Sequence, residues 1–230
     1  MMRLKARGIE PETATYLAAL ATRLADAEIQ MIDRIIKRLK RCGAWSLLDF
    51  LHLLATGTDP DSRINVRNPG TYNLIKVNSP LFSARVGWNS NGSSGYLDTG
   101  FNPASAAGRF AQNSSCLGIG ISTIAQANPV IGNTGTGNSF LTPQTGSNTF
   151  TARLSSLGSS NAANTSIGLF AISRLIASTI LMFKNGGFFL TSAVPSTTMA
   201  NSNIGILSDN GGGRYSPGMT VTFAFAGGGL

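Results

Sequence analysis

The stretch STILMFKNGGFFLTSAV, residues 178–194, places an apolar run on each side of Lys184-Asn185-Gly186-Gly187. Asn-Gly readily adopts the two positive φ angles of a type I′ turn, which joins neighbouring antiparallel strands. Both flanking runs are rich in the β-branched and aromatic residues that favour strands. The stretch therefore predicts a β-hairpin that turns at Asn185 and Gly186.

Similar short runs, separated by turn clusters, recur from Ile64 to the end of the sequence and predict about ten strands. They are YNLIKV, LFSARVGW, SGYLDTGF, CLGIGIST, NTFTARL, SIGLFAIS, STILMFK, GFFLTSAV, NIGILSD and MTVTFAFA. Two glycine-rich stretches, NPVIGNTGTGNSFLTPQTGSN and SDNGGGRYSPG, are expected to be long surface loops. This pattern favours a mainly β fold, a two-sheet antiparallel sandwich of jelly-roll type.

The N-terminal part predicts helices instead. Pro11 suits the first turn of one helix, and a second is expected to begin near Asp26, with a C-cap at Gly43. The second helix has an apolar stripe at three- and four-residue steps, formed by Ile29, Ile32, Ile36 and Leu39. Such a stripe favours packing on the protein's own domain, and a self-associating coil is the alternative. We expect a helical docking or oligomerisation segment over residues 1–44 and the sandwich over residues 45–230.

The segment WSLLDFLHLLAT, residues 45–56, predicts a short turn that leads into a buried strand. It contains His52, the only histidine of the chain. A lone histidine in an apolar run is more often a core residue than a base or a metal ligand. We therefore expect His52 to lie in the core.

Charge is distributed unevenly along the 230 residues. The net charge is +8, and the sequence is nearly neutral through Asp61. From Ser62 onward, Asp98 and Asp209 are the only acids, facing nine basic residues: Arg63, Arg67, Lys76, Arg85, Arg109, Arg153, Arg174, Lys184 and Arg214. These bases do not cluster, so no specific nucleic-acid binding is expected, whereas a diffuse attraction to acidic polysaccharide stays open.

The sequence lacks the usual groups for catalysis, metal binding or cofactor binding. Glycoside hydrolysis normally needs two carboxyl groups, and no glutamate follows Glu28. Cys42 and Cys116 have no metal-type spacing and are expected to be free thiols. No apolar leader and no run long enough to span a membrane is present, so we expect synthesis in the cytosol. We predict neither an enzyme nor a cofactor-binding protein.

Asp98 lies in NGSSGYLDTGFNP, residues 91–103, between a strand pattern and a turn. Its favoured role is to end the strand by an Asx-type hydrogen bond to the backbone, with a ligand contact as the alternative. The candidate glycan contacts are Trp88, Tyr96, Asp98 and Tyr215. For each of the three aromatic residues, however, the sequence favours a core or inter-sheet position over a glycan contact, for Trp88 above all.

Several of these segments resemble a known family. NSPLFSARVGWNSNGSSGYLDTGFNP, CLGIGIST, ILMFKNGGFF, IGILSDNGG and TVTFAFAGGGL are similar to the laminin-G or concanavalin-A-like domain of many bacteriophage and prophage proteins. The upstream AEIQMIDRIIKRLKRCGAWSLLDFLHLLAT is similar to the helical lead-in of the same proteins. The resemblance runs from about Tyr16 onward. Relatives commonly continue past AGGGL with a short helix, whereas this sequence ends at Leu230.

The resemblance implies a virion structural protein of a tail, fibre or other surface appendage, made in the host cytoplasm. Its lectin-like domain would bind host-surface glycan, and the N-terminal helices would contact other virion proteins or copies of the chain. A capsid decoration or connector protein that binds no glycan is the alternative, and a polysaccharide-degrading enzyme is a third hypothesis. The acidic strand motif of the glucanase relatives is absent, so no catalytic residue is carried over.

Overall fold

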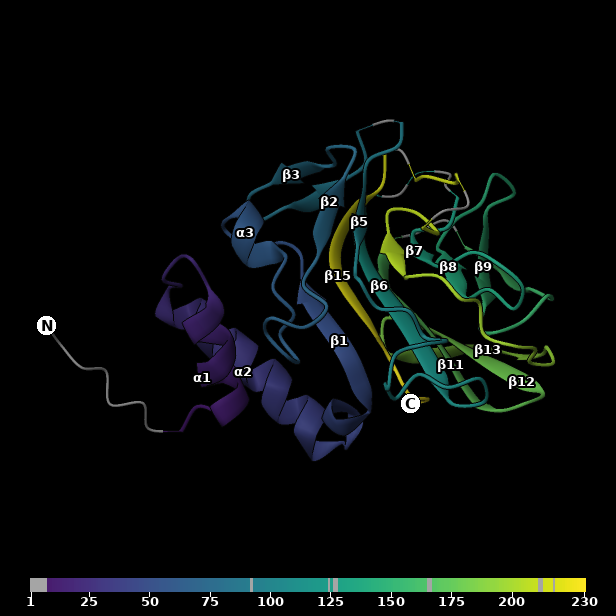
Figure 1. The fold of residues 1–230 in the computed structure, drawn as a ribbon, viewed down its shortest axis with the longest axis horizontal. Helices are drawn as coiled ribbons and strands as arrows, with labels where there is room; N and C mark the ends of the chain where they lie inside the picture. Colours follow the sequence, from purple (N-terminus) through teal and green to yellow (C-terminus); the bar gives the residue numbers. More distant parts are fainter. Residues whose placement is uncertain are drawn as a thin grey trace, which may run out of the picture.

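The computed structural model describes residues 8–91, 93–123, 125, 128–164, 167–210, 213–216 and 218–230. It consists of two antiparallel sheets packed face to face, with helices at the N-terminal side (Figure 1). The predicted mainly β sandwich of jelly-roll type is confirmed. None of the helices in the described ranges is long and apolar enough to cross a membrane.

The larger sheet follows the order β13-β12-β11-β6-β15-β4-β3, and β1 also pairs with β15. Its strands are β1 (Leu48–Leu53), β3 (Leu81–Ser83), β4 (Gly87–Asn89), β6 (Ser115–Thr123), β11 (Gly168–Ile176), β12 (Thr179–Lys184), β13 (Gly187–Ala193) and β15 (Thr220–Gly227). The second sheet follows the order β10-β9-β8-β7-β14-β5-β2. Its strands are β2 (Ile75–Val77), β5 (Tyr96–Asp98), β7 (Ile131–Gly132), β8 (Phe140–Thr142), β9 (Thr149–Arg153), β10 (Ser160–Ala163) and β14 (Gly205–Ile206).

The main core lies between the two sheets. It is formed by alternate residues of facing strands, such as Leu97, Leu141 and Phe150 from the smaller sheet and Ile119 and Phe170 from the larger. Because side chains alternate along a strand, Tyr96, Asp98, Phe140, Thr151 and Arg153 are left on the outer face of the seven-stranded sheet. Hydrophobic burial thus decides which side chains this face presents.

The predicted hairpin is confirmed. Strands β12 and β13 pair across Asn185 and Gly186, whose φ angles are 52° and 80°. Two positive φ angles in succession define the type I′ turn that the Asn-Gly pair favours.

The expectation of one strand over LFSARVGW is wrong. The segment forms the hairpin of β3 and β4, in which Arg85 has a φ of 60° and the Val86 N–H donates to the Ser83 carbonyl at 3.0 Å. At Gly87 an added Cβ would lie 2.1 Å from the Val221 carbonyl oxygen, so β4 approaches β15 through a residue without a side chain.

The stretch NPVIGNTGTGNSFLTPQTGSN is also not a surface loop throughout. It contains β7 and β8, and Val130, Ile131 and Leu141 are fully buried in the core. Strand β10, over Ser160–Ala163, was likewise not expected. These strands span two to four residues, which is too short for an alternating pattern to stand out from a glycine- and asparagine-rich background.

The N-terminal helices α1 (Pro11–Ala19) and α2 (Asp26–Arg41) pack on the outer face of the larger sheet, beside β1 (Figure 1). Tyr16, Ile32 and Ile36 are buried there against Leu51 and Phe225. The expected packing of the α2 stripe on its own domain is therefore confirmed, and the stripe is not available for a self-associating coil.

Two short helices complete the fold: the 3-10 helix η1 (Ala44–Leu47), which precedes β1 as expected, and α3 (Asp59–Ser62). The Asp61 carboxylate of α3 accepts hydrogen bonds from the Ala21 N–H, at 2.6 Å, and from the Thr22 hydroxyl. Asp61 therefore ties the connection between α1 and α2 to the sandwich.

Candidate functional site

The outer face of the seven-stranded sheet is the candidate site. The N-terminal helices cover part of the larger sheet, but within the described ranges no helix covers this second face. Instead, residues 207–210 and 213–216, here called the 207–216 loop, fold back over it and are joined by a bridge between Ser208 and Tyr215. The Ser216 hydroxyl also lies 2.9 Å from the carbonyl oxygens of Asn128 and Pro129.

Two glycines make room for the 207–216 loop. Gly205 of β14 lies opposite Gly132 of β7, so paired positions in two neighbouring strands lack side chains. An added Cβ at Gly205 would lie 2.9 Å from the Asn210 Cβ, and one at Gly132 would lie 2.5 Å from the Phe140 Cβ. The missing side chains let Asn210 and Phe140 approach the backbone closely.

On one side of the paired glycines, Phe140 of β8 lies opposite Arg153 of β9. The Arg153 guanidinium carbon is 5.3 Å from the centre of the Phe140 ring, and that of Arg214 is 5.2 Å from the same centre. Cation–π contacts of this length are favourable, most strongly where water is excluded. The ring thus holds two guanidinium groups that are far apart in the sequence.

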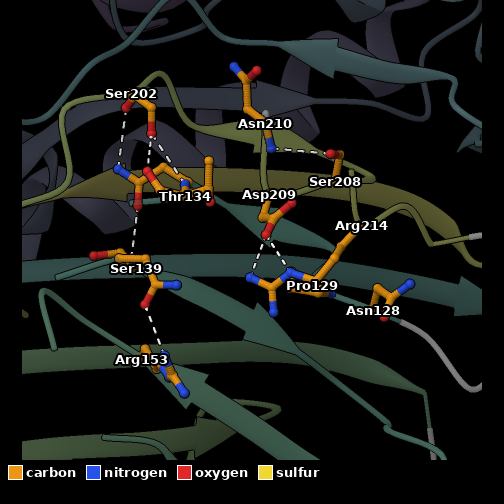
Figure 2. Close-up of polar contacts among 12 residues, drawn as sticks. Asn128, Pro129, Thr134, Ser139, Arg153, Ser202, Ser208, Asp209, Asn210 and Arg214 are labelled. Atoms are coloured by element: carbon orange, nitrogen blue, oxygen red, sulfur yellow. Dashed lines mark hydrogen bonds and ion pairs between the residues drawn. The ribbon is translucent and has the colours of Figure 1, made fainter. Parts of the chain in front are cut away.

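Asp209 orients Arg214 (Figure 2). The Asp209 carboxylate is fully buried, accepts a hydrogen bond from Arg214 Nε at 2.6 Å and forms an ion pair with Nη2. Arg153 donates to neutral oxygens instead: Nε to the Ser159 hydroxyl at 2.7 Å, and Nη1 to Asn138 Oδ1 at 3.4 Å. Both side chains are therefore held in defined orientations.

The segment that carries Asn138 is itself fixed by polar contacts (Figure 2). Asn133 Oδ1 accepts a hydrogen bond from the Ser139 N–H at 2.8 Å. The Ser202 hydroxyl accepts from the Thr134 N–H at 3.2 Å and donates to the Thr134 carbonyl at 2.7 Å. The segment that bonds to Arg153 is therefore held in place by the protein's own hydrogen bonds.

On the other side of the paired glycines, Tyr96 and Tyr215 lie together, with ring centres 6.2 Å apart. The Tyr96 hydroxyl donates to Asn210 Oδ1 at 3.2 Å. Burial, followed by the nearby Asp98 and Tyr215, raises the pKa of Tyr96, so its hydroxyl keeps its proton at neutral pH. Both rings are half-buried, with part of each surface open to solvent.

Asp98 has the structural role that its sequence position favoured. Its Oδ1 accepts a hydrogen bond from the Gly100 N–H at 2.8 Å, which is an Asx turn at the end of β5. Asn203 Nδ2 lies 3.1 and 3.3 Å from the two carboxylate oxygens. Asp98 thus helps to hold the segment after β5 to the segment before β14.

The candidate role of Trp88 as a glycan contact is contradicted by its position. The side chain is fully buried between the sheets, and Nε1 donates to the Ser62 hydroxyl at 2.9 Å. The tryptophan lies on β4 of the larger sheet with its ring in the core, as the alternative for this residue predicted. A ligand at the surface cannot reach it.

Phe140, Arg153 and Arg214 were missed as site residues. The alternation in NTFTARL places Thr149, Thr151 and Arg153 on one face of a strand, and that pattern alone would have marked Arg153. Arg214 gave a weaker signal, as a base five residues after an acid in a loop.

A polar pocket of about 430 Å³ lies elsewhere, lined by Leu48, Asp49, Arg67, Asn68, Thr71, Tyr72, Ala107, Gly108 and Arg109. The Asp49 carboxylate accepts hydrogen bonds from the Arg109 and Phe110 N–H groups at 2.6 and 2.8 Å. Burial raises the pKa of Asp49, and these hydrogen bonds oppose the shift. Because Asp49 holds two segments together, we interpret this pocket as framework.

His52 and the cysteines lie outside the candidate site. His52 is fully buried in β1, as expected, and Cys42 and Cys116 are free thiols. Among the described residues, no group of three or more His, Cys, Asp or Glu is placed to bind a metal ion.

No known protein family and no curated protein matches this chain. Among solved structures, it is similar to Trypanosoma rangeli sialidase in complex with sialic acid, with a TM-score of 0.53 and 15% identity over 94% of this chain and 34% of the sialidase. It is also similar to the receptor-binding domain of botulinum neurotoxin D, with a TM-score of 0.52 and 11% identity over 81% of this chain and 50% of that domain. The chain thus spans about a third of one protein and half of the other. At these identities the likeness shows the fold alone, a β-sandwich.

Proposed function

We propose that this protein binds glycan through the outer face of its seven-stranded sheet. The observation that carries the proposal is the contrast between the two outer faces. The N-terminal helices pack on one, whereas the other presents two tyrosine rings, two arginines and several amides. Sugar rings bind to such surfaces through aromatic contacts and through hydrogen bonds from fixed polar groups.

We propose binding rather than bond cleavage. Glycoside hydrolysis normally requires two carboxyl groups that reach the substrate. Asp209 is fully buried and paired with Arg214, and Asp98 is bonded to Gly100 and Asn203. These positions support a recognition site.

Replacing Tyr215 by alanine should weaken glycan binding. A glycan array probed with the wild-type protein would first identify a bound sugar. An aromatic contact contributes up to about 1.5 kcal/mol, so its loss should lower the affinity for that sugar about tenfold. Titration calorimetry would measure this change. Phe188→Ala is the matched control, because Phe188 is an aromatic residue 65% exposed on β13 of the other sheet. No binding on the array and none to host cells would contradict the proposed glycan binding. An equal loss of affinity in both variants would contradict the proposed face.

We further propose that the chain is a bacteriophage virion protein, which the resemblance in its sequence supports. Its N-terminal helices use their apolar residues against their own sandwich. Docking to other virion proteins would therefore use the outer surface of α2, where Arg34, Arg38 and Arg41 are exposed.

Mass spectrometry of purified particles should detect the chain at a constant copy number. A few copies for each particle would fit a tail or fibre position. Copies on the order of hundreds would instead favour a capsid decoration protein. Absence from purified particles would refute the virion location and would leave glycan binding as a separate question.

A further inference from the structure

Arg153 and Arg214 form a pair of like charges on one aromatic ring. Their guanidinium carbons lie 5.3 and 5.2 Å from the Phe140 ring centre (Figure 2 shows both arginines). Burial lowers the pKa of Arg153, and the positive charge of Arg214 adds to the shift. Arg153 remains protonated at neutral pH, since arginine titrates far above it.

Asp209 neutralises one of the two charges. It is ion-paired to Arg214, whereas no ion pair of Arg153 occurs among the described residues. Elsewhere in the sandwich, Arg63 and Lys76 both form ion pairs with Asp59. One positive charge therefore remains at Phe140 without an acid to balance it.

The two arginines also have donors to spare. Arg153 uses Nε and Nη1, and Arg214 uses Nε and Nη2. Each guanidinium carries five N–H donors in a rigid fork that matches the two oxygens of a carboxylate. A bound carboxylate would accept from these donors and reduce the repulsion between the two cations.

We propose that Arg153 and Arg214 bind the carboxylate of an acidic sugar, so that the outer face of the seven-stranded sheet selects uronate-containing glycan. This inference rests on the glycan binding proposed above and names its substrate class. Tyr96 and Tyr215, on the other side of the paired glycines, would contact the sugar rings, whether they are acidic or neutral.

Titration calorimetry with two matched oligosaccharides tests the inference. One is a galacturonate oligomer, and the other is the same oligomer with its carboxyl groups reduced to alcohols. We expect the wild-type protein to bind the acidic oligomer about tenfold more tightly, because a hydrogen bond to a charged group contributes about 1.5 kcal/mol or more. Arg153→Gln should remove this preference and its salt dependence, so that the acidic and the neutral oligomer bind to the variant with similar affinities.

Arg109→Gln is the matched control, since it removes the same charge from an exposed arginine in the polar pocket beside Asp49. Arg153→Lys, which keeps the charge but loses the fork, should give an intermediate affinity, and it replaces Arg153→Gln if thermal denaturation shows that the latter is unfolded. Arg214 is not varied, because it also stabilises Asp209.

Three results would overturn the inference. Equal affinities for the acidic and neutral oligomers would refute acidic selectivity while leaving glycan binding intact. Loss of the preference in Arg109→Gln but not in Arg153→Gln would show that the carboxylate binds in the pocket beside Asp49 instead. Absence of binding to either oligomer, together with an array that detects no glycan, would refute both the inference and the proposed function.

Discussion

Arg214→Met should destabilise the protein by about 3 kcal/mol, because it leaves the Asp209 carboxylate buried without its partner. Asp209 is fully buried, and among the described residues the polar contacts of its Oδ2 are both made with Arg214. Its second oxygen, Oδ1, has no hydrogen-bond partner among the described residues. Urea denaturation of the wild type and the variant would measure the loss.

Asp209→Asn, which removes the other partner of the ion pair, should destabilise the protein less than Arg214→Met. The side chain of Arg214 is 41% exposed, so in Asp209→Asn its charge can still be solvated by water. In the double variant Arg214→Met/Asp209→Asn no carboxylate is buried, and we expect it to regain at least half of the lost stability. Equal stability of Arg214→Met and the wild type would contradict this explanation, and so would a double variant no more stable than Arg214→Met.

The free energy of unfolding should fall as the pH is lowered below 6.5, because of His52. Burial lowers the pKa of His52 to about 3 from an ordinary value of 6.5, partly opposed by backbone groups of Ile64 and Tyr72. Between these two values the unfolded chain binds a proton that the folded chain does not, so stability is lost as the pH falls. The loss approaches about 1.4 kcal/mol for each pH unit and levels off near pH 3.

Urea denaturation at several pH values between 6.5 and 5 would measure this slope, in a range above the ordinary pKa of carboxyl groups. His52→Phe is the control, since it removes the only histidine and keeps a ring beside Phe50, whose centre lies 5.3 Å from that of His52. We expect a nearly flat profile for this variant. The same slope in both proteins would show that another group is responsible.

Local sequence signals predicted much of the framework. The Asn185-Gly186 turn, the start of α2 at Asp26 and the Asx turn at Asp98 all occur where the sequence placed them. Each depends on the conformational preference of a few neighbouring residues, and no distant contact is needed to recognise it.

The very short strands were not predictable in the same way. Strands β7 and β8, which lie in a stretch expected to be a loop, have two and three residues, and β7 contains Gly132. Glycine disfavours isolated strands, so these segments become strands only because neighbouring strands supply hydrogen bonds and a core to pack on.

The sequence by itself determined a mainly β sandwich with an amphipathic helical lead-in, and it determined that acids are scarce in the sandwich. Only the tertiary structure decided that Phe140, Arg153 and Arg214 meet at one ring and that Trp88 lies in the core. The physical reason is that turns and amphipathic helices are local, whereas the order of strands in a sheet depends on the burial of side chains distant in the sequence. Charges that lie far apart along the chain become neighbours only after that order is set.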